Sequence, residues 1–231
     1  MVFDILLAQL QTAEFIVRKL WREFVSPNAD ADPAEVKRIA GLFRDSRYDI
    51  RAALRALLTS DAFYAPQHRA TLVKSPVDLV VGTLRQFQFS TGDVAPFALV
   101  LAQLGQNLFA PPNVKGWPGG EAWINSTTLL ARKQFLDRLF RSEATRPAPM
   151  MAANINVPPT AAPVVEMRRR LQSALAEIRF DSERWLQQSG GDATQVQRLV
   201  LAMALQHALP PDASGIEMVR RLAQDPVYQL K

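Results

Sequence analysis

Helix-start signals recur along this sequence, and each is followed by apolar residues at helical spacing. Asp32 precedes Pro33 and Glu35, an order in which an aspartate caps the first turn and proline takes a position that needs no N–H donor. Asp49 and Ser75 stand before two further apolar stretches in the same way. No stretch alternates apolar and polar residues over the length of a strand. The sequence therefore predicts an all-α fold, an irregular multi-helix globular array with one long loop rich in Pro, Gly and Trp.

The apolar spacing also predicts where these helices lie. Residues 3–25 should form two helices or one kinked helix, with Thr12 placed to restart the helix after a break. The helix after Asp32 should bury Val36, Ile39, Leu42 and Phe43. Further helices are predicted over residues 50–60, 75–87, 93–104, 126–140, 164–178, 182–188, 192–209 and 214–225.

One stretch without periodicity suggests how these helices are grouped. Residues 146–163 read RPAPMMAANINVPPTAAP, which is rich in Pro, Ala and Asn. We interpret them as a linker or an extended surface crossing. Residues 1–145 are then the main helical region, with the Trp-containing loop at 105–125, and residues 164–231 are a C-terminal helical region that packs on the first.

Composition excludes several classes of site. The 231 residues include no cysteine, so disulfides, thiolate metal sites and a cysteine nucleophile are excluded. The net charge is +5, but Lys and Arg are scattered, which argues against nucleic-acid binding. The dense run Arg168–Arg170 follows Glu166 and is typical of a solvated helix face, with a site for an anionic partner as the alternative. No run approaches the ~20 apolar residues of a transmembrane helix, and the N-terminus has no secretory signal.

No residue pattern in the chain indicates catalysis. His68 and His207 lie far apart and outside any metal-binding spacing, and His207 is expected at the end of a helix. Asp30 with Asp32, and Asp45 with Asp49, directly precede helical stretches and are better explained as caps than as acid and base. The sequence therefore predicts no catalytic residue, no metal ligand and no cofactor.

The loop from Gly105 to Asn125 is the strongest candidate for a binding site. It holds Trp117 and Trp123, and Lys115 and Asn125 lie close enough in sequence to add polar contacts. An exposed pair of tryptophans would offer a rigid face to a glycan or a protein partner. In the alternative interpretation, which we favour, both indoles fold back and fasten the loop to the helices.

Four segments resemble one known family. They read FAPPNVKGWPGGEAWINSTTLLAR at Phe109–Arg132, FIVRKLWREFV at Phe15–Val25, LRALLTSDAFYAPQHRATLVKSPVDLVVGTLR at Leu54–Arg85, and LAQDPVYQL near the C-terminus. The chain is similar to the C-terminal half of the bacterial family catalogued as domain of unknown function 1800 (DUF1800). The resemblance implies an exported or periplasmic full-length protein and a sulfatase-like partner protein. It also implies an N-terminal half, with a helical segment containing histidine and glutamate, that has no counterpart before Met1.

Two functional hypotheses follow. We expect a non-catalytic helical binding or assembly module, the C-terminal part of an exported bacterial protein. The alternative is a fragment of an envelope or polymer-processing enzyme whose reactive groups lie in the N-terminal half, with Lys115, Trp117, Trp123 and Asn125 forming one wall of its cleft. Apolar residues also crowd the first ten positions, so we expect an apolar surface there and self-association or binding of a second polypeptide.

Overall fold

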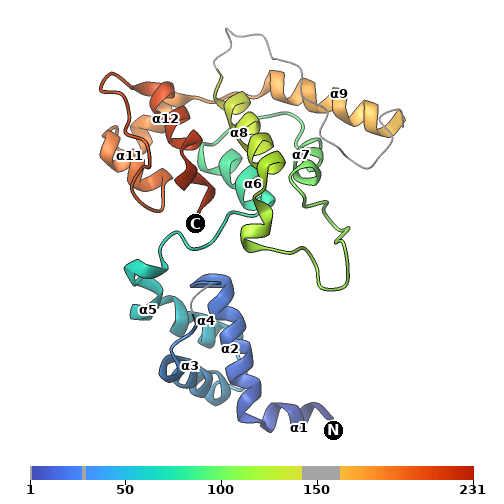
Figure 1. The fold of residues 1–231 in the computed structure, drawn as a ribbon, viewed down its shortest axis with the longest axis vertical. Coiled ribbons are helices and arrows are strands. Elements are labelled where there is room, and N and C mark those ends of the chain that lie inside the picture. The colour runs from blue at the N-terminus through green and yellow to red at the C-terminus, as the bar shows by residue number, and fades with distance from the viewer. Residues whose placement is uncertain (1, 28–29, 142–161) are drawn as a thin grey trace. The chain divides into compact units, whose positions relative to one another are not determined.

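The protein is seen in a computed structural model that describes residues 2–27, 30–141 and 162–231. These residues form twelve α-helices and three short 3-10 helices (Figure 1). Within the described ranges, strand-like pairing is limited to two isolated bridges, Val73 with Leu230 and Ser90 with Arg179. The all-α prediction is confirmed.

The chain divides into two compact units, Met1–Leu72 and Val73–Lys231. No boundary at residue 72 is predicted from the sequence. The sequence predicts one at 146–163, and most of that segment lies in 142–161, outside the described residues. The linker therefore stays a prediction, while its last two positions belong to helix α9 (Ala162–Glu177).

The first unit is built around a three-helix core. Its elements are α1 (Val2–Ala8), α2 (Leu10–Phe24), α3 (Pro33–Asp45), α4 (Ile50–Leu58), α5 (Asp61–Tyr64) and the 3-10 helix η1 (Pro66–His68). Helices α2, α3 and α4 pack against one another and bury their apolar faces. Helix α1 packs beside α2 and contributes no buried residue. The core residues are Ala13, Val17, Trp21, Val25, Ala31, Val36, Ile39, Ala40, Phe43, Ala53 and Leu57.

Three of the four residues predicted to be buried on α3 lie in this core, and Leu42 does not. Leu42 is 44% exposed, whereas Ala40 is 1% exposed. Starting from Val36, positions three, four and seven residues on share one helix face, and Ala40 rather than Leu42 falls on it. The stripe is therefore completed by a small residue that the sequence analysis passed over.

The second unit has its own core, which is rich in aromatic rings. Its elements are α6 (Pro76–Gln86), α7 (Phe97–Gln103), the 3-10 helix η2 (Gly120–Trp123), α8 (Ser126–Phe140), α9, α10 (Ser182–Gln188), α11 (Ala193–Val200), α12 (Gly215–Gln224) and the 3-10 helix η3 (Pro226–Gln229). Phe87 lies at the centre of this core, with ring centroids 4.9 Å from those of Phe140 and Trp185. Helix α12 packs on α8 and α7 packs on α9, so segments from both ends of the unit share one core.

Side-chain caps set the starts of the predicted helices. The carboxylates of Asp32 and Asp49 each accept a backbone N–H two residues on, at 3.0 Å. Ser75 and Asp78 form a reciprocal capping box at the start of α6. Each such cap contributes about 1 kcal/mol to stability. These helix starts confirm the capping signals in the sequence.

The predicted helix over residues 192–209 is wrong in its second half. Helix α11 ends at Val200, and the chain is irregular until α12. The carboxylate of Asp225 accepts the backbone N–H groups of Gln206 at 3.2 Å and His207 at 3.1 Å. Because this contact takes donors that a helix would need, tertiary structure overrides the local helix propensity. His207 therefore does not lie at a helix end, and its side chain is 79% exposed.

Candidate functional site

The loop between α7 and α8 begins at Gly105, which has a φ of 97°. Only glycine adopts this conformation without strain, and it turns the chain away from α7. A β-carbon built on Gly105 would lie 3.9 Å from Cζ3 of Trp123, so the far end of the loop folds back against its beginning. The two ends of the loop therefore lie close together.

Trp123 and Asn125 attach the end of the loop to α8. Trp123 is 6% exposed. The Asn125 side chain accepts the backbone N–H of Thr128 at 2.9 Å, and the Thr128 hydroxyl accepts the backbone N–H of Asn125 at 2.9 Å. This capping box starts α8. For these two residues the packing favours the interpretation in which the loop is fastened to the helices.

Lys115 and Trp117 lie in the outer part of the loop. Lys115 is exposed and Trp117 is half-buried. The backbone N–H of Lys115 donates to Oδ1 of Asn113 at 2.8 Å, an Asx turn that shapes the loop locally. The structure does not bring the four predicted residues together in one exposed site, because Trp123 is buried and the Asn125 side chain caps α8. A binding role for Lys115 and Trp117 stays a prediction.

The loop also presents two exposed apolar residues that the sequence analysis did not single out. Phe109 is 98% exposed and has a φ of 62°, a left-handed conformation that is rare for an aromatic residue. Val114 projects fully into solvent. In the sequence, the only indication of their exposure was their position on either side of Pro111 and Pro112, which cannot lie inside a helix.

The largest apolar exposure of the first unit lies on α1 and the start of α2. We call this set of residues the α1 surface. Phe3 is 71% exposed and Ile5 63%, and the other members are also exposed. The α1 surface comprises Val2, Phe3, Ile5, Leu6, Leu7, Leu10 and Phe15. This exposure agrees with the apolar surface that the sequence predicts for the first ten residues.

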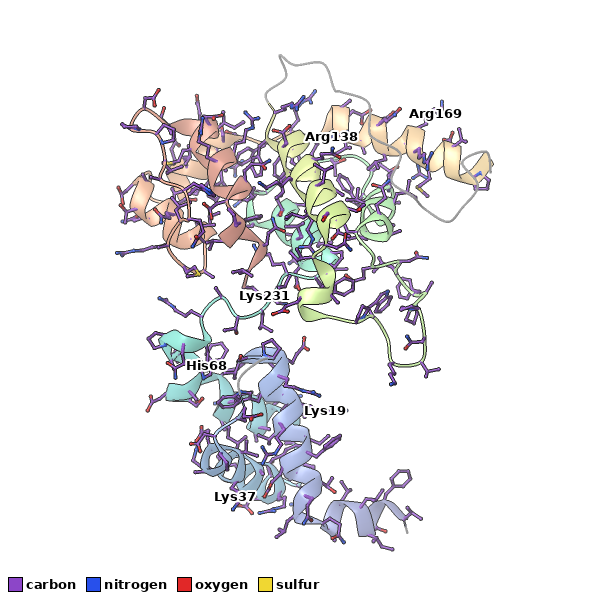
Figure 2. All side chains as sticks on the ribbon, in the orientation of Figure 1. Lys19, Lys37, His68, Arg138, Arg169 and Lys231 are labelled. Atoms are coloured by element: carbon purple, nitrogen blue, oxygen red, sulfur yellow. The ribbon has the colours of Figure 1, made fainter. Side chains whose placement is uncertain are left out.

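Two hydroxyl groups of the first unit hold helix α1 through its backbone. The Tyr48 hydroxyl donates to the carbonyl oxygen of Leu7. The Thr12 hydroxyl donates to the carbonyl oxygen of Leu6 at 2.5 Å, across the break between α1 and α2. The apolar side chains of α1 are therefore left free, and Figure 2 shows them extending from the helix.

The basic run on α9 is largely compensated by acidic partners. Arg169 pairs with Glu166 at 3.0 Å, and Arg170 pairs with Asp93 at 2.6 Å. The hydrogen bond from Arg169 holds the pKa of Glu166 below its usual value, and the hydrogen bond from Arg170 lowers that of Asp93. Exposed pairs of this kind contribute little to stability. The contacts support the interpretation of a solvated helix face.

The described residues contain no group of three or more His, Cys, Asp or Glu side chains placed to hold a metal ion. His68 is half-buried and contacts Trp21 edge to face, with ring centroids 5.6 Å apart. His207 lies in the second unit, with Nδ1 3.6 Å from Asp225. None of the helices in the described ranges is both long and apolar enough to span a membrane.

The family model described as "Protein of unknown function (DUF1800)" matches residues 1–230, which is essentially the whole chain. No curated protein and no solved structure shows significant similarity to it. Because the match covers far more than half of the sequence, the chain belongs to the DUF1800 family.

Proposed function

We propose that this chain is a helical assembly module that associates with a second copy of itself through the α1 surface. The observation that carries the proposal is the exposure of seven large apolar side chains on one short helix and the start of the next. Stable monomers rarely expose contiguous apolar patches beyond a few hundred Å². Covering such a patch gains about 25 cal/mol for each Å² of apolar area removed from water.

The charges near the α1 surface favour a second copy as its partner. Between residues 2 and 17 the charged residues are Asp4 and Glu14, and Arg18, Lys19, Arg22 and Glu23 follow on α2. Glu14 lies 3.9 Å from Arg18 on the same helix, so Asp4 is the acidic residue at the far end from the basic segment. In an antiparallel pair related by a twofold axis, the acidic end of one copy lies against the basic segment of the other. Each favourable contact is then made twice.

The basic segment borders the apolar residues directly. The Lys19 ammonium lies 4.7 Å from the centroid of the Phe15 ring. An antiparallel copy that covers Phe15 would therefore also bring its acidic end close to Lys19. An anionic membrane is a poorer partner, because helices that bind it carry Lys or Arg on their polar face and α1 carries only Asp4.

Sedimentation equilibrium of the purified chain over a range of concentrations tests the proposal. We expect a reversible dimer, and we expect Leu6→Glu to dissociate it, because a buried carboxylate would face the apolar surface of the other copy. Since α1 contributes no buried residue, this substitution leaves the core of the first unit intact. The control is Val114→Glu, which changes a still more exposed apolar residue in the loop and should leave the dimer unchanged.

A monomer at all concentrations would overturn the proposal. The same holds if Val114→Glu dissociates the dimer as strongly as Leu6→Glu does. The family resemblance adds two further proposals, an exported location and a sulfatase-like partner protein. A chain that stays monomeric while its α1 surface binds a hydrophobic dye would point to such a partner in place of a second copy.

A further inference from the structure

Arg132 on α8 is a buried cation that forms no ion pair with a carboxylate in the described part of the chain. It is fully buried, and its guanidinium donates to two neutral oxygens, Oε1 of Gln229 at 3.1 Å and the carbonyl oxygen of Lys74 at 2.9 Å. Its Nε is buried and makes no hydrogen bond. A buried charge that is not paired with an opposite charge is costly. Burial accordingly lowers the pKa of Arg132 to about 10.

A second cation, the Lys74 ammonium, lies beside it. Nζ of Lys74 is 3.6 Å from the centroid of the Tyr228 ring. No carboxylate of the described residues forms an ion pair with this ammonium. The backbone of Lys74 is fixed on both sides, because its N–H donates to the carbonyl oxygen of Gln229 at 2.8 Å and its carbonyl accepts from Arg132. Burial lowers the pKa of Lys74 to about 8.

The carboxylate that acts on both cations, Asp78, is already engaged. It accepts hydrogen bonds from Nζ of Lys231 at 2.6 Å and from the Ser75 hydroxyl at 2.8 Å. Burial alone would raise the pKa of Asp78, but these hydrogen bonds outweigh it and hold the pKa below its usual value. Asp78 therefore interacts with three cations, and among the described residues it forms an ion pair with Lys231 but not with Lys74 or Arg132.

The phenol of Tyr228 does not supply a second negative charge. Burial raises its pKa well above the usual value, so the hydroxyl stays protonated. The hydroxyl lies 2.8 Å from that of Thr83 and donates to Oε1 of Gln86 at 3.2 Å, so it is used within the core. Only the face of the ring meets Lys74.

We propose that this cluster is a binding site for a small dianionic oxyanion, phosphate or sulfate or one of their monoesters. The ammonium groups of Lys74 and Lys231 bind the anion, and Arg132 is a positioning residue that holds the backbone of Lys74 and adds positive charge. Three cationic side chains face one carboxylate side chain, so the cluster favours an anionic ligand. The cluster reaches solvent, because the side chains of Lys231 and Asp78 are 41% and 38% exposed.

Calorimetric titration at constant ionic strength tests the site, with sulfate, inorganic phosphate and glycerol phosphate as probes and chloride as the background. We expect Lys74→Met to weaken binding by about ten-fold or more, which corresponds to the loss of one charge contact. Lys37→Met is the matched control, because Lys37 is an exposed lysine of the first unit (Figure 2). It should bind as the unaltered chain does.

Two further arms sharpen the result. Lys231→Met should also weaken binding, and because Lys231 is partly exposed it tests the site even if Lys74→Met folds poorly. The affinity for sulfate should fall as the pH rises through about 8, because Lys74 loses its proton there and sulfate does not titrate in this range. The charged and titratable groups that surround the Lys74 ammonium are Asp78, Lys231, Arg132 and Tyr228. Tighter binding of glycerol phosphate than of phosphate would identify a monoester as the ligand.

The proposal is overturned if none of the three anions binds. It is equally overturned if Lys37→Met weakens binding as much as Lys74→Met does, because the anions would then respond to overall charge rather than to this cluster.

Discussion

Replacing Lys74 with methionine should change how stability depends on pH. The pKa of Lys74 falls from its ordinary 10.5 in the unfolded chain to about 8 in the folded one. At about 1.4 kcal/mol for each pKa unit, keeping Lys74 charged in the folded state costs about 3 kcal/mol. The side chain is partly open to water, so about 1–3 kcal/mol is the expected measured range.

The sign follows from the direction of the change. Because the folded chain binds the proton more weakly than the unfolded chain, the cost is fully present below pH 8 and disappears as the pH rises to 10.5. Urea unfolding of both proteins at several pH values, in chloride alone, measures the difference between their free energies of unfolding. We expect Lys74→Met to be the more stable at pH 7 and to lose this advantage by pH 10.5. A difference that stays constant across this range would refute the argument, and Lys37→Met should show no such trend.

Three predictions concern the loop and its attachment. Trp123→Ala should lower the free energy of unfolding by about 3–5 kcal/mol, because it removes a buried indole, and thermal unfolding would show this directly. Trp117→Ala should cost less than about half of that, since the indole is half-buried; an equal loss from both variants would contradict the difference in packing. Asn125→Ala should cost about 1 kcal/mol through loss of the cap on α8, and Asn125→Asp, which keeps the acceptor oxygen, should restore most of it.

The helices could be predicted from the sequence because their signals are local. Asp32, Asp49 and Ser75 act on N–H groups two or three residues away, and the apolar residues after them repeat within a few turns. The stop of α11 could not be predicted in this way. It depends on Asp225, which lies 18 and 19 residues beyond the backbone groups that it binds.

The same distinction between local and long-range contacts applies to the candidate sites. The apolar character of α1 was visible in its composition, and the start of α8 at residue 126 was visible in the apolar spacing that follows it. The Lys74 cluster was not, because Arg132 contacts residues 58 and 97 positions away. Nothing in the sequence around Arg132 indicates that an arginine in this helix is fully buried, since helical spacing alone does not reveal which neighbours cover it.

The most direct test of assembly through the α1 surface is a distance between two copies. The chain contains no cysteine, so a Gln11→Cys variant carries a single spin label at an exposed position beside α1. Pulsed electron resonance should then detect a defined label-to-label distance between copies, and adding Leu6→Glu to the same chain should abolish it. A labelled chain that gives no intermolecular signal at concentrations where it sediments as a dimer would show that the copies associate elsewhere, and would contradict the proposal.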